Sequence, residues 1–454
     1  MLSKFFNFLF GDKVFNKKLF TLALPISLQN LMLALVAAAD AVMLGKLEQN
    51  AMAAVSLATQ IQFVQNMFLG AICWGVGVLG AQYWGKKDIL FLGRLFGLSI
   101  RESLIISVVF FIGCRFFPDK LMKLFASDPV LINIGAEYLR IAAWSYLITG
   151  ISQCYLAIMR VSEHAVYSAW ISSVTVVVNI ILNAVLIFGL FGVPAMGVKG
   201  AALATLIARI FELCWCIGTT FGKTFIKLKI RMIFSFSRIL LLDFWRYTGP
   251  ILGAFILWGV GFTAYTAIMG HMGCDAAAGN AIAAVVRDLM CCLCNGIAVG
   301  SGIIIGNELG AGDLAKGKLY GEKALVMSFV AGIISLCMIL CSIPVVLSFI
   351  QLTTQAREYM IGMFCIMSFY MIGRCICTVV INGVFSAGGD TMFDPISVLV
   401  AMYGVGLPCA FLGAFYFHWP VLVIYGCTCL DEVGKVPWVI CHFLKYKWVK
   451  NITR

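Results

Sequence analysis

The sequence predicts an all-α integral membrane protein with twelve transmembrane helices in two six-helix lobes, related by a pseudo-twofold axis along the membrane normal. Three observations lead to this fold class: the composition, the length of the apolar runs and an internal repeat. Of 454 residues, 62% are hydrophobic and 12% are charged, and the mean hydropathy is +0.98. Soluble domains contain about 45–50% apolar and about 25% charged residues. The chain is therefore expected to lie in a lipid bilayer.

The apolar runs are long enough for helical spans. A helix needs about 20 mainly apolar residues to cross a bilayer, and lipid cannot satisfy open backbone, so helices are expected rather than strands. The first run follows a charged leader and contains Pro25 without a small-residue cleavage site, which is typical of a membrane helix and not of a signal peptide. Twelve spans are predicted near 18–44, 51–80, 94–116, 134–158, 165–190, 196–220, 241–269, 276–305, 318–347, 358–385, 393–417 and 419–443.

The distribution of Lys and Arg predicts the orientation. If the N-terminus is cytoplasmic, the inside segments carry 21 of the 33 Lys and Arg residues, and the outside loops carry six. Cytoplasmic loops of membrane proteins are enriched in these residues. We therefore expect both termini in the cytoplasm. The net charge of +12 is then mostly a topology signal, and no nucleic-acid partner is expected.

A repeat divides the chain into two homologous halves. The stretch GAQYWGKKD at 80–88 returns in altered form as IGNELGAGD at 305–313, which aligns Gly85 with Gly310 at an offset of 225. The same offset pairs Pro25 with Pro250. We expect an N-terminal lobe over 1–225 and a C-terminal lobe over 226–454. Each half holds six spans, an even number, so both halves begin on the cytoplasmic side, and a substrate path between them is expected near the membrane midplane.

The eighteen cysteines lie almost entirely within the spans. Groups such as Cys291, Cys292 and Cys294 have metal-like spacing, but no histidine or second pair accompanies them at ligand distance in the sequence. We interpret them as small packing residues rather than as a metal site.

A set of motifs resembles the multidrug and toxic compound extrusion transporters. The motifs occur in family order and cover the chain from about 18 to 445. They are LALPISLQN (22–30), AADAVMLGKL (38–47), GAQYWGKKD (80–88), VNIILNAVLIFG (178–189), MGVKGAALAT (196–205), GNELGAGD (306–313) and NGVFSAGGDT (382–391). The resemblance implies a cleft that faces one side of the membrane at a time, and export of organic cations in exchange for Na⁺ or H⁺.

Asp40 is a lone carboxylate in the apolar run NLMLALVAAADAVMLG. A charge at mid-helix costs about 2.5–3.5 kcal/mol on insertion scales, so it is normally paired or kept for a transport pathway. A buried carboxylate can take up a proton near neutral pH or bind a small cation. The alternative is a structural carboxylate hydrogen-bonded to neighbouring helices. Under the offset of 225 it falls opposite Tyr265, so the acid is specific to the first half.

Neutral oxygen ligands are available on the fifth and sixth spans. Asn179 and Asn183 are spaced i, i+4 and share one helix face, and Thr205 is a hydroxyl on the next span. In the family, the first-helix aspartate and these polar residues form the cation site of the N-terminal lobe. One branch has aspartate where this chain has Asn183, so this site would carry one formal charge, which suits either Na⁺ or H⁺. Two asparagines could instead only join helices by hydrogen bonds.

The second half departs from some family branches, which place acids on the seventh and tenth helices. The matching positions here are Trp258 and the neighbourhood of Arg374 and Cys375. We therefore expect coupling through the N-terminal lobe only. Tyr265, Trp258 and Arg374 are candidate substrate-cleft residues, since aromatic rings can stack on flat cations. Arg374 has no acid nearby in sequence, so its partner must be substrate or another helix, with Asp431 and Glu432 as candidates.

Other charges inside the spans occur as close pairs of opposite sign. Mutual neutralisation or snorkelling explains them better than a functional role. The predicted pairs are Arg101 with Glu102, Glu137 with Arg140, Arg209 with Glu212, and Arg287 with Asp288.

These features favour a secondary active antiporter that exports organic, amphipathic cations in exchange for Na⁺ or H⁺. No Walker or dinucleotide motif follows a strand, and the four histidines stand singly, so neither an enzyme nor a cofactor is expected. The alternatives are a flippase of lipid-linked glycans with similar architecture and a channel or membrane scaffold. We expect a monomer in a bacterial plasma (inner) membrane, with a small organic molecule and the bilayer as its partners.

Overall fold

The computed structural model describes residues 12–222, 226, 230–234, 237–349 and 353–453. The described residues form helices joined by short turns, and no strand occurs among them. Eleven described helices are long and apolar enough to cross a membrane, and the first of these spans is Lys13–Val36. The expected all-α fold is confirmed.

Eleven of the predicted spans correspond to long helical segments, and the structure extends most of them by several residues. In the first half the elements are α2 (Lys13–Leu47), α3 (Gln49–Gly85), α4 (Ile89–Phe116), α5 (Pro118–Met122), α6 (Pro129–Val161), α7 (Ala165–Phe188), η1 (Leu190–Gly192) and α8 (Gly197–Thr219), and the short helix α9 (Ile230–Ile233) follows it.

The second half follows the same order of long helices, with two stretches of π-helix. Its elements are α10 (Arg238–His271), α11 (Cys274–Gly310), α12 (Leu314–Phe349), α13 (Thr354–Cys377), η2 (Thr378–Phe385), α14 (Phe393–Val398), η3 (Leu399–Gly406), α15 (Leu407–Phe415), α16 (Val421–Thr428), α17 (Leu430–Val433) and α18 (Val436–Phe443). The helix α13 continues through η2, and α14, η3 and α15 form one further continuous span.

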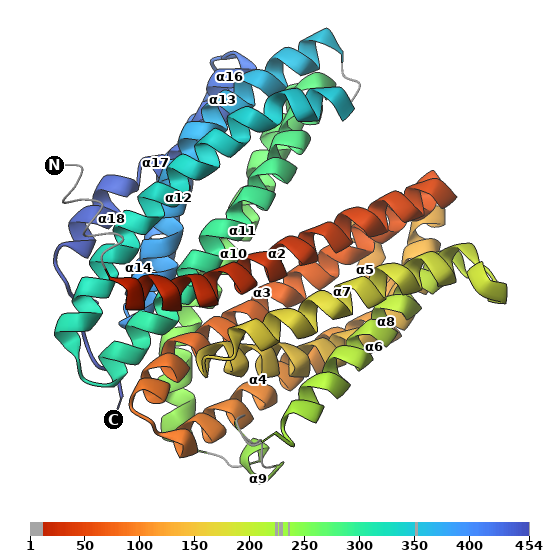
Figure 1. Ribbon diagram of the computed structural model, residues 1–454. Helices are drawn as coiled ribbons and strands as arrows, with labels where there is room; N and C mark the ends of the chain where they lie inside the picture. Colours follow the sequence, from red (N-terminus) through yellow and green to blue (C-terminus); the bar gives the residue numbers. More distant parts are fainter. Residues whose placement is uncertain (1–11, 223–225, 227–229, 235–236, 350–352, 454) are drawn as a thin grey trace. The chain divides into compact units, whose positions relative to one another are not determined.

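The chain forms two compact units. Unit 1 comprises Met1–Ser27, Ala81–Lys87 and Trp245–Arg454, and unit 2 comprises Leu28–Gly80 and Asp88–Phe244. Within unit 2, α4, α6, α7 and α8 pack against one another, and within unit 1, α11, α12 and α13 lie side by side (Figure 1). These two units are defined by contacts and not by the repeat. The boundary between the repeats, placed between residues 225 and 226, therefore stays a prediction.

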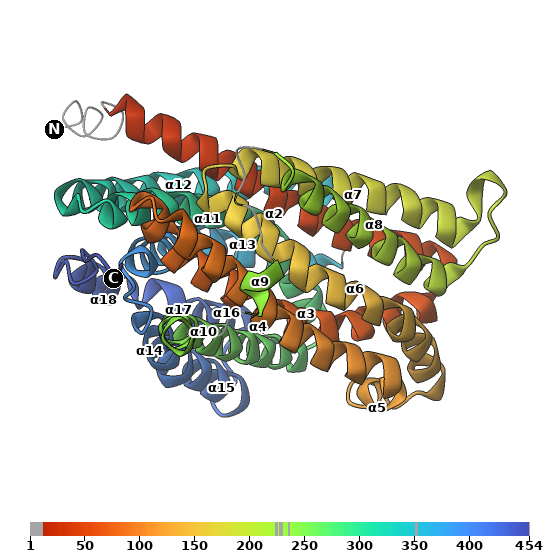
Figure 2. The same ribbon diagram turned by 90° about the horizontal axis from the view of Figure 1, so that it is seen from below.

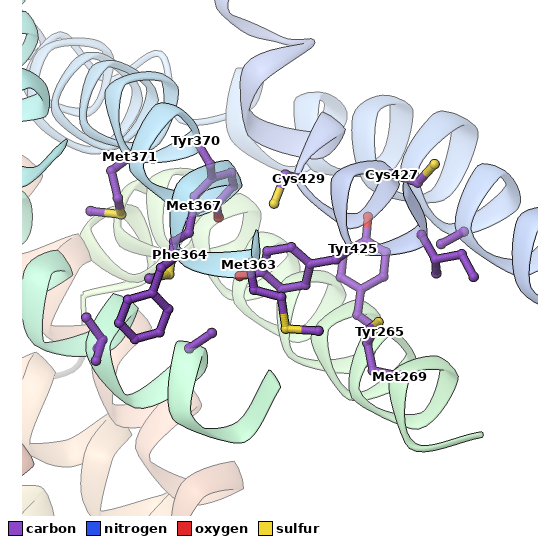
Figure 3. Packing of buried hydrophobic residues seen from close by; sticks show 14 of the residues in the cluster. Tyr265, Met269, Met363, Phe364, Met367, Tyr370, Met371, Tyr425, Cys427 and Cys429 are labelled. Atoms are coloured by element: carbon purple, nitrogen blue, oxygen red, sulfur yellow. The ribbon is translucent and has the colours of Figure 1, made fainter. Parts of the chain in front are cut away.

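The core of unit 1 is rich in sulfur and aromatic rings (Figure 3). One face of α13 contributes Met360, Phe364, Met367 and Met371, all fully buried. Their i, i+4, i+7 spacing places them on a single stripe of the helix. Cys291, Cys294, Cys375, Cys427 and Cys429 pack in the same cluster, and all 18 cysteines of the chain are free thiols. Those five cysteines are thus packing residues, as the sequence indicated.

The repeated motif forms the same turn twice. Lys87 and Gly312, which are equivalent under the offset of 225, both have left-handed backbone, with φ of 63° and 89°. The next residue is an aspartate in each case. Asp88 accepts a hydrogen bond from the backbone N of Phe91 (2.9 Å), and Asp313 accepts one from that of Lys316 (3.0 Å). Each aspartate therefore caps the helix that follows, which explains the shared spacing.

The two copies of the motif also contact each other, within unit 1. A Cβ added to Gly85 would collide with the backbone carbonyl of Asn307, and one added to Gly310 would collide with that of Gln82. Gln82 and Asn307 are themselves equivalent, so one contact maps onto the other under the repeat. Such reciprocity is the signature of a two-fold relation. The glycines are present because the backbones of α3 and α11 approach closely here.

The twelfth predicted span, 419–443, is the exception among the helices. It folds as three short helices, α16, α17 and α18, and not as one continuous helix. The breaks fall at Cys429 and at Gly434 and Lys435, on either side of α17, which carries Asp431 and Glu432, and Pro437 lies in the first turn of the last helix. Proline fits the first turn of a helix but not its interior.

Candidate coupling site and charge cluster

The predicted ligands of the first half lie on α7 and α8, which pack closely within unit 2. The contact depends on small residues. Gly200 of α8 lies against the backbone of Leu186, and Ala201, Ala202 and Ala204 are almost fully buried beside it. Small residues let transmembrane helices approach each other. The motif MGVKGAALAT therefore supplies the face that packs on the asparagine-bearing helix.

The structure brings Asn179, Asn183 and Thr205 together. The side-chain amide of Asn183 donates to Oδ1 of Asn179 (3.2 Å), and the amide of Asn179 donates to Oγ1 of Thr205 (3.5 Å). Thr205 in turn donates to the carbonyl of Ala201 (3.1 Å). Both asparagines are buried. The result is a chain of polar groups, rich in oxygen, inside an otherwise apolar helix pair.

Gln29 is a further buried polar residue that contacts α7, and the sequence patterns did not single it out. It is 4% exposed on α2, and its amide donates to Oγ of Ser172 on α7 (2.8 Å). Its Oε1 has no hydrogen-bond partner among the described residues. The signal was present in the motif LALPISLQN, where an amide follows an apolar run, as the carboxylate of Asp40 does.

Asp40 lies within α2, seven residues before its end. Its side chain is outside the part of the chain that the structure describes. The assignment of this residue as the coupling carboxylate therefore stays a prediction.

The candidate cleft residues of the second half lie on α10 and α13, in unit 1. Trp258 is half-buried and stacks on Phe262, with ring centroids 5.4 Å apart. The guanidinium of Arg374 lies 5.7 Å from the centre of the Trp258 ring, within range of a cation–π interaction. Tyr265, by contrast, is 6% exposed and belongs to the core of unit 1 (Figure 3).

Arg374 has a partner from another helix, which is one of the two alternatives that the sequence left open. It forms a salt bridge with Glu432 on α17, and Lys435 lies 2.9 Å from the other oxygen of the same carboxylate. Glu432 and Lys435 are buried. Removing one partner from such a buried ion pair is costly, because it leaves the other charge uncompensated. Arg374 and Glu432 are 58 positions apart and meet only because α13 packs against α17. The sequence could therefore offer Glu432 and Asp431 as candidate partners but could not decide between them.

Three of the four local ion pairs predicted from the sequence are present. Arg101 bonds Glu102 (2.9 Å), Arg209 bonds Glu212 (2.7 Å) and Arg287 bonds Asp288 (2.9 Å).

The fourth predicted pair, Glu137 with Arg140, is wrong. The short helix α5 brings Asp119 to Arg140 (3.2 Å), and Lys199 reaches Glu137 (3.5 Å). These partners lie on other helices, α5 and α8, so the sequence could not anticipate them.

An open groove of about 500 Å³ also lies on unit 1, between α10 and the η3–α15 segment. Its lining is almost wholly apolar and includes His271, Tyr403, Phe411 and Phe415. Neither Trp258, Tyr265 nor Arg374 lines it, so the groove and the predicted cleft residues are separate features.

Known proteins resemble the chain over nearly its whole length. The transporter YisQ of Bacillus subtilis is 24% identical over 450 residues, which cover 97% of this chain and 95% of that protein. A probable multidrug resistance protein NorM of Thermotoga maritima is 25% identical over 468 residues, covering 99% of this chain and 97% of that protein.

Solved structures share the fold. A transporter of the MOP superfamily from Pyrococcus furiosus has a TM-score of 0.86 at 18% identity, with 97% of this chain and 98% of that chain covered. A variant of the Vibrio cholerae MATE transporter VcmN has a TM-score of 0.88 at 16% identity, with the same coverage.

The family model described as MatE matches the chain twice, over residues 25–185 and 250–412. The two matches begin 225 residues apart, at Pro25 and Pro250, which is the offset of the sequence repeat. Together they include more than half of the chain. The resemblance inferred from the motifs is thereby confirmed, and the chain belongs to the MatE family of multi-pass membrane transporters.

Proposed function

We propose that this protein is a secondary active antiporter that exports organic, amphipathic, cationic compounds in exchange for Na⁺ or H⁺. The observation that carries the proposal is the family match in both halves, because it covers the scaffold that such transporters use. Relatives of similar length are named multidrug resistance proteins, and one solved structure of the same fold is described as a multidrug resistance MATE transporter.

The proposed coupling site is Asp40 with Asn179, Asn183 and Thr205. The helix register supports it. Gln29 of α2 bonds Ser172 of α7, and the two helices run in the same direction in both views (Figures 1 and 2). Eleven residues further along each helix, about three turns, stand Asp40 and Asn183. The two positions are therefore expected at the same depth and on the facing sides of α2 and α7.

In the proposed mechanism the carboxylate of Asp40 holds the charge of the coupling ion. A proton would bind it directly, and Na⁺ would also use the amide oxygens and the threonine hydroxyl, which are hard ligands suited to such a cation. Ion and substrate would compete across the transport cycle. Linkage then requires that each lowers the binding affinity of the other by the same factor.

The flippase alternative loses its main support in the structure. A groove for a pyrophosphate head group needs cationic side chains that are not already neutralised. Arg374, which has no acid nearby in the sequence, could serve in that role, but it is paired with Glu432. For the channel or scaffold alternative we find no specific observation in its favour.

The remaining parts of the proposal concern the setting of the protein. We place it in a bacterial plasma (inner) membrane as a monomer, with both termini in the cytoplasm. It would carry no cofactor and catalyse no chemical reaction, and an ion gradient would drive it.

The test is efflux of a fluorescent organic cation from proteoliposomes under an imposed Na⁺ or pH gradient. We expect gradient-driven efflux by the wild type and its loss in Asp40→Asn, with the effective gradient identifying the ion. Asp119→Asn is the matched control, because this aspartate is half exposed and pairs with Arg140 outside the proposed site. Equal efflux by Asp40→Asn and the wild type would refute the coupling role, and no efflux under either gradient would refute the antiporter.

A further inference from the structure

A cluster of buried charges lies inside unit 1, whereas the residues of the proposed coupling site belong to unit 2. Its centre is Glu432, whose carboxylate binds Arg374 through one oxygen and faces Lys435 through the other. Asp431, the preceding residue, is 6% exposed, and its Oδ1 has no hydrogen-bond partner among the described residues. Among the described residues, Arg374 and Lys435 both form ion pairs with Glu432, and neither forms one with Asp431.

The five charged groups of this cluster have a net charge of −1 when all of them are ionised. Arg374 and Lys435 carry two positive charges. Glu432, Asp431 and Asp394 on α14, which interacts electrostatically with the same groups, carry three negative charges when ionised. An uncompensated charge in a low-dielectric interior is strongly unfavourable. Binding of one positive charge would make the five groups neutral.

The other groups that surround Asp431 come from several helices. Tyr265 of α10 and Tyr370 of α13 interact electrostatically with it, and the hydroxyl of Tyr265 also has no hydrogen-bond partner among the described residues. Figure 3 shows the ring of Tyr265 reaching toward the segment that carries Cys429, two residues before Asp431. Arg287 of α11 interacts with Cys429 and Tyr370 but is bonded to Asp288.

The chemistry of these groups selects a proton over other ligands. A metal cation would sit beside two fixed cations, and the described residues contain no group of three or more His, Cys, Asp or Glu side chains able to hold a metal. An anion would meet a carboxylate oxygen. A proton needs no cavity, neutralises the charge at its source and turns Oδ1 into a donor.

We propose that Asp431 is a proton-binding site in the C-terminal half of this transporter, additional to the coupling site of the first half. The step is formation of an O–H bond at a carboxylate oxygen of Asp431, with the proton taken from water and later returned to it. Asp431 is preferred to Glu432, which holds both cations, and to Asp394, which is less buried. Only the role of Asp431 in ion coupling depends on the proposed transport function. The proposal replaces the expectation that residues of the first half alone couple ion binding to transport.

The test is a pH titration of the purified protein by infrared difference spectroscopy, without substrate. We expect the wild type to gain the C=O stretching band of a buried protonated carboxyl group as the pH falls. Asp431→Asn should lack this band, and Asp431→Glu should shift its frequency and midpoint. Asp119→Asn, at an exposed ion pair, should leave it unchanged.

Two outcomes would overturn the assignment. A band that persists unaltered in both Asp431 variants would do so, and so would a band that is lost in Asp394→Asn but kept in Asp431→Asn. Because the readout needs no transport, it stands even if the efflux experiment fails. If efflux succeeds, Asp431→Asn should also lower the number of protons exchanged per substrate molecule by one.

Discussion

At the scale of single residues, Asp12 and Lys323 form an ion pair that fixes the start of α2. Oδ2 of Asp12 lies 2.7 Å from Nζ of Lys323, and Oδ1 accepts a hydrogen bond from the backbone N of Phe15 (3.0 Å). The side chain of Lys323 is 7% exposed, and its ammonium lies over the ring of Phe15. The hydrogen bond from Lys323 lowers the pKa of Asp12 below its ordinary value of 3.8.

This lowered pKa predicts a pH-dependent stability. The folded state binds the proton of Asp12 less readily than the unfolded state, so the carboxylate stabilises the fold above pH 3.8. That contribution is lost as the pH falls through the lower pKa of the folded state. In thermal unfolding in detergent, Asp12→Asn should therefore unfold at a lower temperature than the wild type at pH 7, and the difference should shrink below pH 3.8.

A double-mutant cycle provides the control. Combining Asp12→Asn with Lys323→Met should reveal a coupling energy at pH 7 that disappears under acid. A coupling energy that is equal at both pH values would mean that the ion pair is not its source.

The residues also show where sequence reasoning stops. Arg101 with Glu102 and Arg209 with Glu212 could be paired from the sequence because neighbours on one helix are within reach of each other. Glu137 and Arg140 are also neighbours on α6, but Lys199 and Asp119 are their partners instead. Arg374 with Glu432 requires α13 to lie against α17, and Asp119 meets Arg140 only because α5 folds back on α6. The cluster around Asp431 could not be predicted for the same reason.

At the scale of elements, hydropathy located the spans because apolar runs in lipid have one solution, the helix. It could not locate the π-helical stretches η2 and η3, since a wider turn leaves composition unchanged. It also missed that the last span breaks into α16, α17 and α18. There the charges and Pro437 were visible in the sequence, but the contacts with Arg374 that make a break tolerable were not.

Alanine substitutions at two glycines of α3 should change the free energy of unfolding in opposite directions. A methyl group at Gly85 would meet the carbonyl of Asn307, whereas nothing lies within 4 Å of the same position at Gly77. Gly85→Ala should lower the free energy of unfolding by about 1–3 kcal/mol, the usual cost of overpacking. Gly77→Ala should raise it by up to about 1 kcal/mol, because alanine favours the helix.

Unfolding in a denaturing detergent, followed by circular dichroism, would measure both. Gly310→Ala should resemble Gly85→Ala, because its methyl group would meet the carbonyl of Gln82 in the equivalent contact. A neutral Gly85→Ala would mean that the two backbones do not approach as closely as described.

At the scale of the whole molecule, the C-terminal tail links segments far apart in the sequence, all within unit 1. The backbone N of Ile452 donates to Oε1 of Gln82 (2.8 Å), and the amide of Gln82 donates to the carbonyl of Ala387 (2.7 Å). Asn451 donates to the carbonyl of Gly310 (3.4 Å). A residue of the first half, Gln82, is therefore held by the last residues of the second.

Trp448 is the anchor of this tail and carries the last prediction. Its side chain is fully buried, lies against Gly321 and stacks on Phe443, and its indole N–H donates to the carbonyl of Phe443 (3.2 Å). Trp448→Ala should lower the free energy of unfolding by about 3–5 kcal/mol, because it leaves a cavity the size of an indole ring. Trp438→Ala, at a tryptophan that is 38% exposed, should cost clearly less in the same unfolding assay. Hydropathy alone would treat the tail as dispensable, because its residues follow the last span. A loss for Trp448→Ala no greater than that for Trp438→Ala would mean that the tail does not hold these segments together.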